Sequence, residues 1–147
     1  MMNQDDADSL ERFVLAQAGD YDVALRELKQ GQKQSHWIWY ILPQLRGLGR
    51  SSMAQKFGVK GRREAVAYLQ HEVLGPRLRE CISAILEHKD KTAEAILGSV
   101  DAMKLRSCLT LFAEVAPEEP CFQEALDAFF GGERDSMTLE LLSQEKD

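Results

Sequence analysis

The sequence has little cysteine, and its cysteines show no pattern of a disulfide framework or a zinc site. The chain holds three, Cys81, Cys108 and Cys121, an odd number at wide spacing without a C-x-x-C pair. Zinc sites use closely spaced cysteines and histidines, and small disulfide scaffolds use an even number of cysteines. We therefore expect three reduced thiols packed in the core, no metal site and no bound cofactor.

Long hydrophobic runs and an excess of basic residues are also absent. No apolar run approaches the ~20 residues of a membrane span, and the opening residues MMNQDDADS contain no signal-peptide core. The net charge of −6 repels phosphate backbones unless a strong local basic patch compensates, and no such patch stands out. We expect a cytoplasmic protein that binds neither membranes nor nucleic acids.

Short catalytic motifs are missing too. The chain has no H-E-x-x-H, no P-loop, no G-x-G-x-x-G after a strand and no G-x-S-x-G elbow. Many active sites have no short motif, so whether the protein is an enzyme stays open. His36 is the only catalytic candidate, because an imidazole can take up or release a proton near neutral pH; a structural histidine is the alternative.

Helical periodicity is what the sequence has in abundance. Apolar residues recur at i, i+3, i+4 and i+7 along most of the 147 residues, and glycines and capping residues separate the stripes. This pattern predicts an all-α fold: a single compact domain over residues 1–147 of about eight or nine short helices around a buried central helix. Residues 1–8 and 143–147 should fray. The expected helix ends include Gly31 and Gly131-Gly132, Ser51 and Thr92 are expected to be N-caps, and Asp135-Ser136 is expected to start the last helix.

The stretch from Gly31 to Ser52 combines core-forming and anion-binding residues. Its apolar run, Trp37 to Leu42, has no polar face and should be enclosed by other elements. Alternation would permit a strand, but nothing else in the chain offers a partner strand. We therefore expect a short buried helix from Ser35, as N-cap, to Leu42, ended by Pro43. Such a helix would place His36, Trp39 and Tyr40 on one side.

Polar and aromatic side chains around this stretch form a candidate binding site for an anion. Aromatic faces stack on a base or sugar, basic groups bind phosphate, and a helix N-terminus near Arg50 and Ser51 favours negative charge. A plain N-cap and a solvated basic face are the alternatives. The candidate ligand-binding residues are Lys33, His36, Trp39, Gln44, Arg50 and Ser51, with Lys104 and Arg106 opposite.

Two functions fit these residues. The first is binding of a small anionic, nucleotide-like ligand. The second is a non-catalytic protein–protein interaction module, in which the same residues form a structural network beside a helical groove. An enclosed pocket favours the first function, and an exposed apolar groove favours the second.

Several segments of the chain together form a recognisable pattern, and the K-x-S-H-W-x-W core is its most specific part. They are RFVLAQ (12–17), GQKQSHWIW (31–39), ILPQLRGLGRS (41–51), YL (68–69), LGPRLREC (74–81) and KLRSCLTLF (104–112). With these segments the chain resembles, over nearly its whole length, the bacterial family called domain of unknown function 1810, sometimes mislabelled calpastatin. The resemblance implies an all-helical fold and no established activity. A weaker similarity, confined to Phe13 to Gln17, is to helical proteins that act on NAD and ADP-ribose derivatives.

Overall fold

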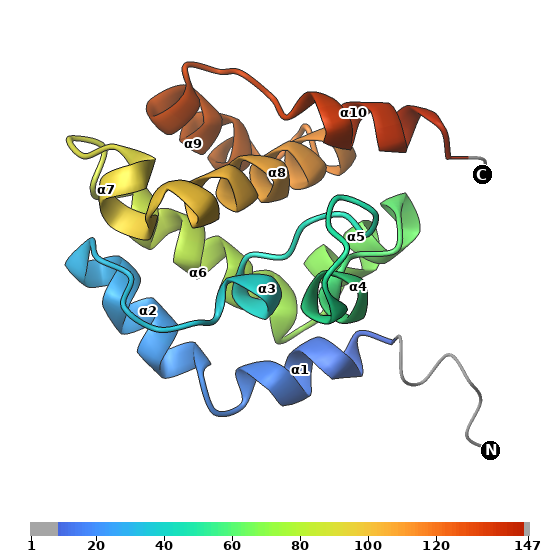
Figure 1. The fold of residues 1–147 in the computed structure, drawn as a ribbon, viewed down its shortest axis with the longest axis horizontal. Helices are drawn as coiled ribbons and strands as arrows, with labels where there is room; N and C mark the ends of the chain where they lie inside the picture. Colours follow the sequence, from blue (N-terminus) through green and yellow to red (C-terminus); the bar gives the residue numbers. More distant parts are fainter. Residues whose placement is uncertain (1–8, 146–147) are drawn as a thin grey trace.

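Residues 9–145 are described by the computed structural model and form ten helices joined by short connections (Figure 1). The expected all-α, single-domain fold is confirmed, with slightly more helices than the periodicity predicted. The helices are α1 (Glu11–Gln17), α2 (Tyr21–Gln30), α3 (Ile38–Ile41), α4 (Ser52–Phe57), α5 (Arg62–Gln70), α6 (Leu74–Leu86), α7 (Ala93–Leu97), α8 (Ser99–Val115), α9 (Pro120–Phe130) and α10 (Ser136–Ser143).

The longest helix, α8, runs through the body of the molecule and packs against α5, α7, α9 and α10 (Figure 1). Apolar residues on several sides of it are buried, among them Leu109, Leu111 and Ala113. A helix that is apolar over most of its circumference must be covered by neighbours on most sides. The core is therefore organised around α8, with α6 as the second large contributor.

The ends of several helices lie where local sequence signals placed them. The side chains of Ser51, Thr92 and Asp135 accept hydrogen bonds from the backbone N–H three residues ahead, at 3.1, 3.0 and 2.9 Å. Gly31 ends α2 with a φ of 76°, in the left-handed region that favours glycine. These predictions are confirmed because capping depends on contacts within a few residues.

The helix expected from Ser35 to Leu42 is much shorter in the structure. Only Ile38–Ile41 is helical, and Trp37 rather than Ser35 is its N-cap residue. The Ser35 hydroxyl instead donates to the Glu27 carboxylate at 2.6 Å, which draws the preceding chain toward α2. The expected burial of this segment is confirmed except at Trp39, which is only partly buried.

The connection between α3 and α4 is held by long-range contacts. An isolated parallel bridge joins Leu45 to Val59. Arg12 of α1, itself buried, forms an ion pair of 2.9 Å with Glu64 and donates to the carbonyls of Lys56 and Gly58 at 2.7 and 2.8 Å. These contacts fix the end of α4 against α1 and α5.

The chain ends were expected to fray. In the structure Ser143 is the last residue of α10, and the Glu145 carboxylate accepts from the backbone N–H of Arg62 at 3.0 and 3.2 Å. Residues 1–8 and 146–147 lie outside the described part of the chain. No helix between residues 9 and 145 has the length and apolar character that a membrane crossing requires.

Candidate functional site

A cleft of about 450 Å³ brings five of the eight candidate residues together. Trp39 of α3 and the loop after it form one wall, and α8 with the start of α10 forms the other. We call it the Trp39–Lys104 cleft. It is lined by Trp39, Gln44, Leu48, Gly49, Arg50, Ser51, Val100, Met103, Lys104, Ser107, Asp135 and Met137.

Lys104 and Trp39 form the central pair of this cleft. The Lys104 ammonium lies 4.6 Å from the centre of the Trp39 ring, close enough for a cation–π contact. The two residues are 65 positions apart and come from different helices, so only the folded chain joins them. The pair presents a positive charge and a partly exposed aromatic surface at one place.

Lys33 does not line the cleft but is connected to it through Asp101. The Asp101 carboxylate lies 2.8 Å from the Lys33 ammonium and 3.5 Å from that of Lys104. Lys33 also donates to the Ser35 carbonyl and lies 5.0 Å from the centre of the Trp37 ring. Lys33 therefore lies behind the wall of the cleft and does not line it.

Arg50 and Ser51 lie at the start of α4. Ser51 is the N-cap, as its 3.1 Å contact with the Ala54 N–H shows, and it is exposed. α4 has only six residues, so its dipole alone is a weak attractor for anions. The exposed Arg50 guanidinium forms no ion pair with any residue between 9 and 145, which leaves its charge available to the cleft.

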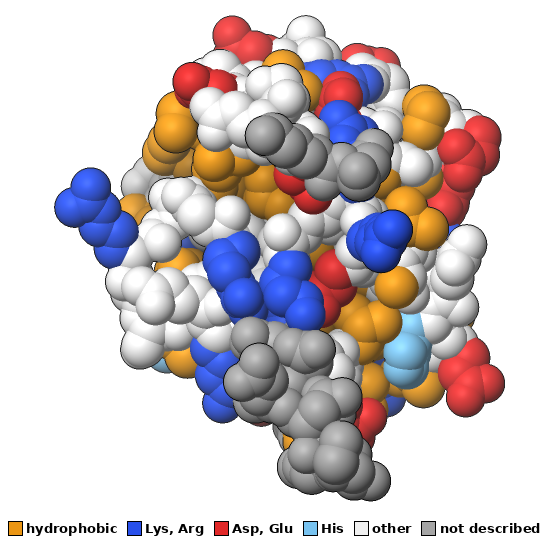
Figure 2. All heavy atoms as spheres, turned by 90° about the vertical axis from the view of Figure 1, so that its right-hand side faces the viewer, with side chains coloured by type: hydrophobic (Ala, Val, Ile, Leu, Met, Phe, Trp, Pro, Cys, Tyr) orange, Lys and Arg blue, Asp and Glu red, His pale blue; other side chains and the backbone are white. Residues whose placement is uncertain are grey.

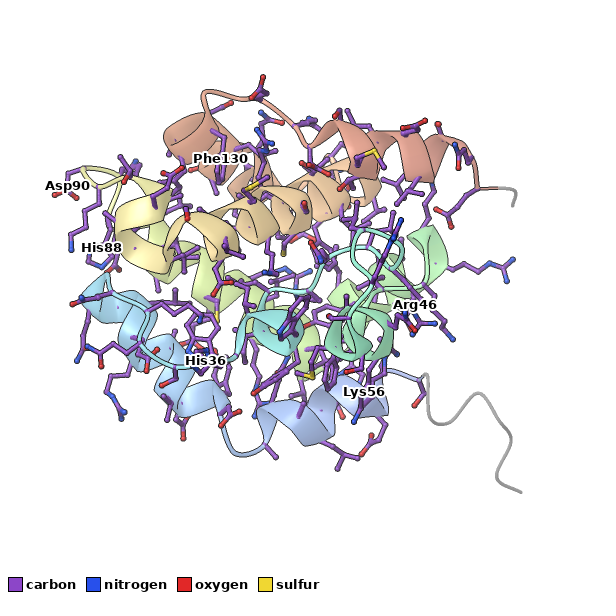
Figure 3. All side chains as sticks on the ribbon, in the orientation of Figure 1. His36, Arg46, Lys56, His88, Asp90 and Phe130 are labelled. Carbon is purple, nitrogen blue, oxygen red and sulfur yellow. The ribbon has the colours of Figure 1, made fainter. Side chains whose placement is uncertain are left out.

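His36 and Arg106 do not line the cleft. The helix that would have put His36 beside Trp39 and Tyr40 begins two residues later, and His36 is exposed on the connection between α2 and α3 (Figure 3). Arg106 contacts Glu133 at 3.0 Å and Asp135 at 4.0 Å, so it supports the wall that Asp135 forms.

The most important residue missed from the sequence is Glu27. Its buried carboxylate accepts hydrogen bonds from the backbone N–H groups of Gln34 and Ser35, the Ser35 hydroxyl and the Trp37 indole, all between 2.6 and 2.9 Å. Burial raises the pKa of a carboxyl group, but these hydrogen bonds outweigh burial and lower the pKa of Glu27 to about 2. Its position between Ala24 and Leu28, on the apolar face of α2, was the available signal.

A second missed signal is the distribution of charge along the chain. Between Glu27 and Glu64 the sequence contains no acidic residue but eight basic ones. The loop that lines the cleft lies inside this interval, so its local charge is opposite to that of the whole chain. The eight residues are Lys29, Lys33, Arg46, Arg50, Lys56, Lys60, Arg62 and Arg63.

Exposed apolar side chains also gather at the cleft. Val100, Met103 and Met137 are exposed by 66%, 63% and 50%, and all three line it. Exposed large apolar side chains are few among residues 9–145, and the two others, Leu15 and the less exposed Val66, do not line the cleft. Grouped exposed apolar residues indicate a contact surface for a ligand or partner.

A second hollow of about 530 Å³ lies near the two ends of the described chain and contains none of the candidate residues. It is lined by Lys60 and Arg63 but also by Glu64 and Glu145, which already bind Arg12 and the Arg62 N–H.

Lys and Arg side chains also gather on the surface that forms the right-hand side of the molecule in Figure 1. Figure 2 views this surface directly and shows them near its middle. Arg46 and Lys56 lie on this side of the molecule in Figure 3.

The cysteines are free, and none lines the Trp39–Lys104 cleft. Cys81 and Cys108 are buried, as expected, whereas Cys121 is half-buried. Burial raises the pKa of the Cys81 thiol to about 12 and also raises the pKa of Cys108. Thiols that stay protonated are poor nucleophiles and poor metal ligands. Among the described residues, no group of three or more His, Cys, Asp and Glu side chains is arranged to hold a metal ion.

Comparison with known proteins identifies the family. A family model described as a protein of unknown function, DUF1810, matches residues 7–142. The chain belongs to the DUF1810 family. Its fold is similar to the crystal structure of the conserved hypothetical protein Rv1873 from Mycobacterium tuberculosis, which is 43% identical to it. That match covers 92% of this chain and 97% of that chain, with a TM-score of 0.91. No curated protein matches the chain.

The segments that carry the DUF1810 resemblance have identifiable places in the structure. The K-x-S-H-W-x-W core wraps around the Glu27 carboxylate and delivers Trp39 to the cleft. The segment Phe13 to Gln17 belongs to α1, where Gln17 is buried and donates to the Tyr40 carbonyl at 2.7 Å. Leu15 of the same segment is exposed, and none of the residues from Phe13 to Gln17 lines the cleft.

Proposed function

We propose that the protein binds a small anionic, nucleotide-like ligand, such as a nucleotide or an ADP-ribose derivative, in the Trp39–Lys104 cleft. The observation that carries the proposal is the Lys104 ammonium 4.6 Å from the Trp39 ring, in a cleft that Arg50 also lines. Nucleotides combine a flat aromatic base with phosphate, and this cleft combines an aromatic face with two cationic side chains.

The lining supplies the contacts that such a ligand requires. A base can pack on the exposed part of Trp39 and against the thioether of Met103, because thioethers make favourable contacts with aromatic rings. Phosphate oxygens can accept from Arg50, whose guanidinium forms two parallel hydrogen bonds, and from Lys104. A volume of about 450 Å³ lies in the range of small-molecule pockets.

We assign no reaction to the cleft. Its lining includes neither histidine nor cysteine, and its acidic residue, Asp135, already caps α10 by accepting from the Thr138 N–H at 2.9 Å. Catalysis by His36 would require that residue to reach a ligand from outside the lining. Binding is therefore the function that the geometry supports best.

Fluorescence and calorimetry together test this proposal. Of the two tryptophans, Trp37 is buried and only Trp39 lines the cleft, so AMP should change the emission of the wild-type protein. In Trp39→Phe the emission change should disappear, while calorimetry still detects binding. Lys104→Met should weaken AMP binding by about tenfold or more, the effect of losing a hydrogen bond to a charged group.

Lys89→Met is the matched control, because Lys89 is exposed on the connection between α6 and α7 and outside the cleft. It removes the same charge and should leave the AMP affinity unchanged. Equal weakening by both substitutions would indicate general charge attraction, and the cleft would lose its support.

The exposed apolar residues favour a second candidate function, a protein–protein interaction module. Val100 and Met103 on α8 and Met137 on α10 would be the anchors of that contact. A partner surface would bury them, whereas a small ligand needs only the inner wall. Met137→Gln separates the two: it should impair an interaction module but leave AMP binding within about threefold, because Trp39, Arg50 and Lys104 remain.

A further inference from the structure

Asp101 occupies a position between two lysines that the proposed function does not explain. Its carboxylate lies 2.8 Å from Lys33 and 3.5 Å from Lys104, and none of the three side chains is more than 18% exposed. Charges this poorly solvated interact more strongly than exposed surface pairs. Asp101 therefore neutralises part of the positive charge directly behind the cleft.

The first turn of α8 does not account for this arrangement. Asp101 is the third residue of that helix, where an acidic side chain interacts favourably with the helix dipole. That effect explains a negative charge at position 101 but not two ammonium groups converging on it. Lys33 comes from the connection after α2, whose path is set by the Glu27 carboxylate.

Ion pairs around the cleft leave little positive charge for a ligand. Arg50 carries a full positive charge with no ion-pair partner among residues 9–145, whereas Lys104 shares Asp101 with Lys33. Asp135, on the same wall as Lys104, is negative, and Arg106 lies 4.0 Å from it. The positive charge available to a ligand is therefore small: Arg50 and part of Lys104.

We infer that Asp101 sets the charge of the ligand, limiting the cleft to a molecule with about two negative charges, the charge of one phosphate monoester or of a diphosphate diester. A nucleoside triphosphate brings more charge than Arg50 and Lys104 can balance, and the excess is repelled by Asp101 and Asp135. This inference rests on the proposed function, because it concerns the same cleft. Asp101 is a specificity-determining residue that acts through Lys104.

Binding of AMP, ADP and ATP to the full-length protein tests this inference. Calorimetry at fixed ionic strength, without divalent cations, gives the ratio of the ATP and AMP dissociation constants. The wild type should bind AMP more tightly than ATP. In Asp101→Asn that ratio should fall about tenfold, because repulsion by one unit charge across a partly solvated cleft grows with ligand charge. Asp101→Glu keeps the charge and should keep the wild-type ratio.

Two further variants provide an opposite expected change and a matched control. In Lys33→Met the Asp101 carboxylate keeps only Lys104 as an ion-pair partner, so less positive charge remains near the cleft. The ratio of the ATP and AMP dissociation constants should therefore rise. Asp22→Asn makes the same substitution in the first turn of α2, on an exposed side chain outside the cleft, and should leave the ratio unchanged.

The outcomes are distinguishable. If the wild type and folded Asp101→Asn bind none of the three nucleotides, the proposed function is overturned and this inference with it. If AMP binds but Asp101→Asn leaves the ratio unchanged, or alters it no more than Asp22→Asn does, the inference about Asp101 alone is overturned.

Discussion

The indole N–H of Trp37 donates a 2.9 Å hydrogen bond to the buried carboxylate of Glu27. Three further donors from Gln34 and Ser35 reach the same carboxylate, so one acidic side chain holds the turn that leads from α2 into α3. A buried charge is tolerated only where hydrogen bonds replace its hydration. This cluster makes the position of Trp39, two residues farther along, depend on a residue in the middle of α2.

The Glu27 cluster should make stability depend on pH. The pKa of Glu27 is about 2 in the folded protein against 4.5 for an ordinary glutamate, so the unfolded state takes up a proton at higher pH than the folded state. The contribution is present above about pH 4.5 and is lost as the pH falls toward 2, amounting to about 3 kcal/mol. Urea unfolding of the wild type and Glu27→Gln between pH 7 and pH 3 measures the part of this loss that falls above pH 3, about 2 kcal/mol. A decline toward acid pH that is equally steep in Glu27→Gln would assign the effect to other carboxylates.

Trp37→Ala should destabilise the fold. Trp37 is 1% exposed and is among the largest fully buried side chains of the described residues. Removing a buried aromatic costs ~3–5 kcal/mol, a large share of the stability of a domain this size. Denaturant unfolding measures the loss, and Trp39→Ala is the control, expected to cost much less because Trp39 is only partly buried. A loss below about 1 kcal/mol for Trp37→Ala would contradict its core role.

Gly31→Ala should be destabilising although it adds only a methyl group. The φ of 76° disfavours any residue with a Cβ, and the added Cβ would lie 2.9 Å from Nδ1 of His88. The Nε2 atom of His88 also contacts the Lys29 carbonyl at 2.8 Å, so the ring cannot move without losing that contact. We expect a loss of about 1–3 kcal/mol in thermal or urea unfolding. In Gly31→Ala/His88→Ala part of it should return, and no recovery would show that backbone strain alone is responsible.

Arg50→Ala should separate binding from stability. The Arg50 side chain is exposed and forms no ion pair within residues 9–145, so unfolding should change by less than about 0.5 kcal/mol. AMP affinity should fall by about tenfold or more, as expected for a lost charged hydrogen bond. His36→Ala is the control outside the cleft and should not change affinity. If Arg50→Ala and the wild type bind AMP with equal affinity, Arg50 does not contact the phosphate of the ligand.

The sequence alone determined those features that depend on near neighbours. The helical class follows from apolar periodicity, and the ends at Gly31, Gly131, Ser51, Thr92 and Asp135 follow from backbone preferences and side-chain caps that act over a few residues. The family resemblance was also readable there. Four of the eight candidate binding residues, Trp39, Gln44, Arg50 and Ser51, line one cleft from a single stretch of chain, because aromatic and polar residues on a turn-rich segment lie near a surface wherever that segment packs.

Only the tertiary structure decided which side chains meet. The local signals favoured Ser35 as an N-cap, but a carboxylate eight residues earlier competes for its hydroxyl and shortens the helix. Lys104 of α8 reaches the ring of Trp39, and Asp101 of the same helix joins Lys33 to Lys104, because the fold brings α8 against the chain that runs from Lys33 to Trp39. His36 does not lie on one helix face with Trp39 because the helix begins only at Ile38. Contacts across 60 or more positions depend on how whole helices pack, and the pattern of apolar residues along one helix carries no information about its neighbour.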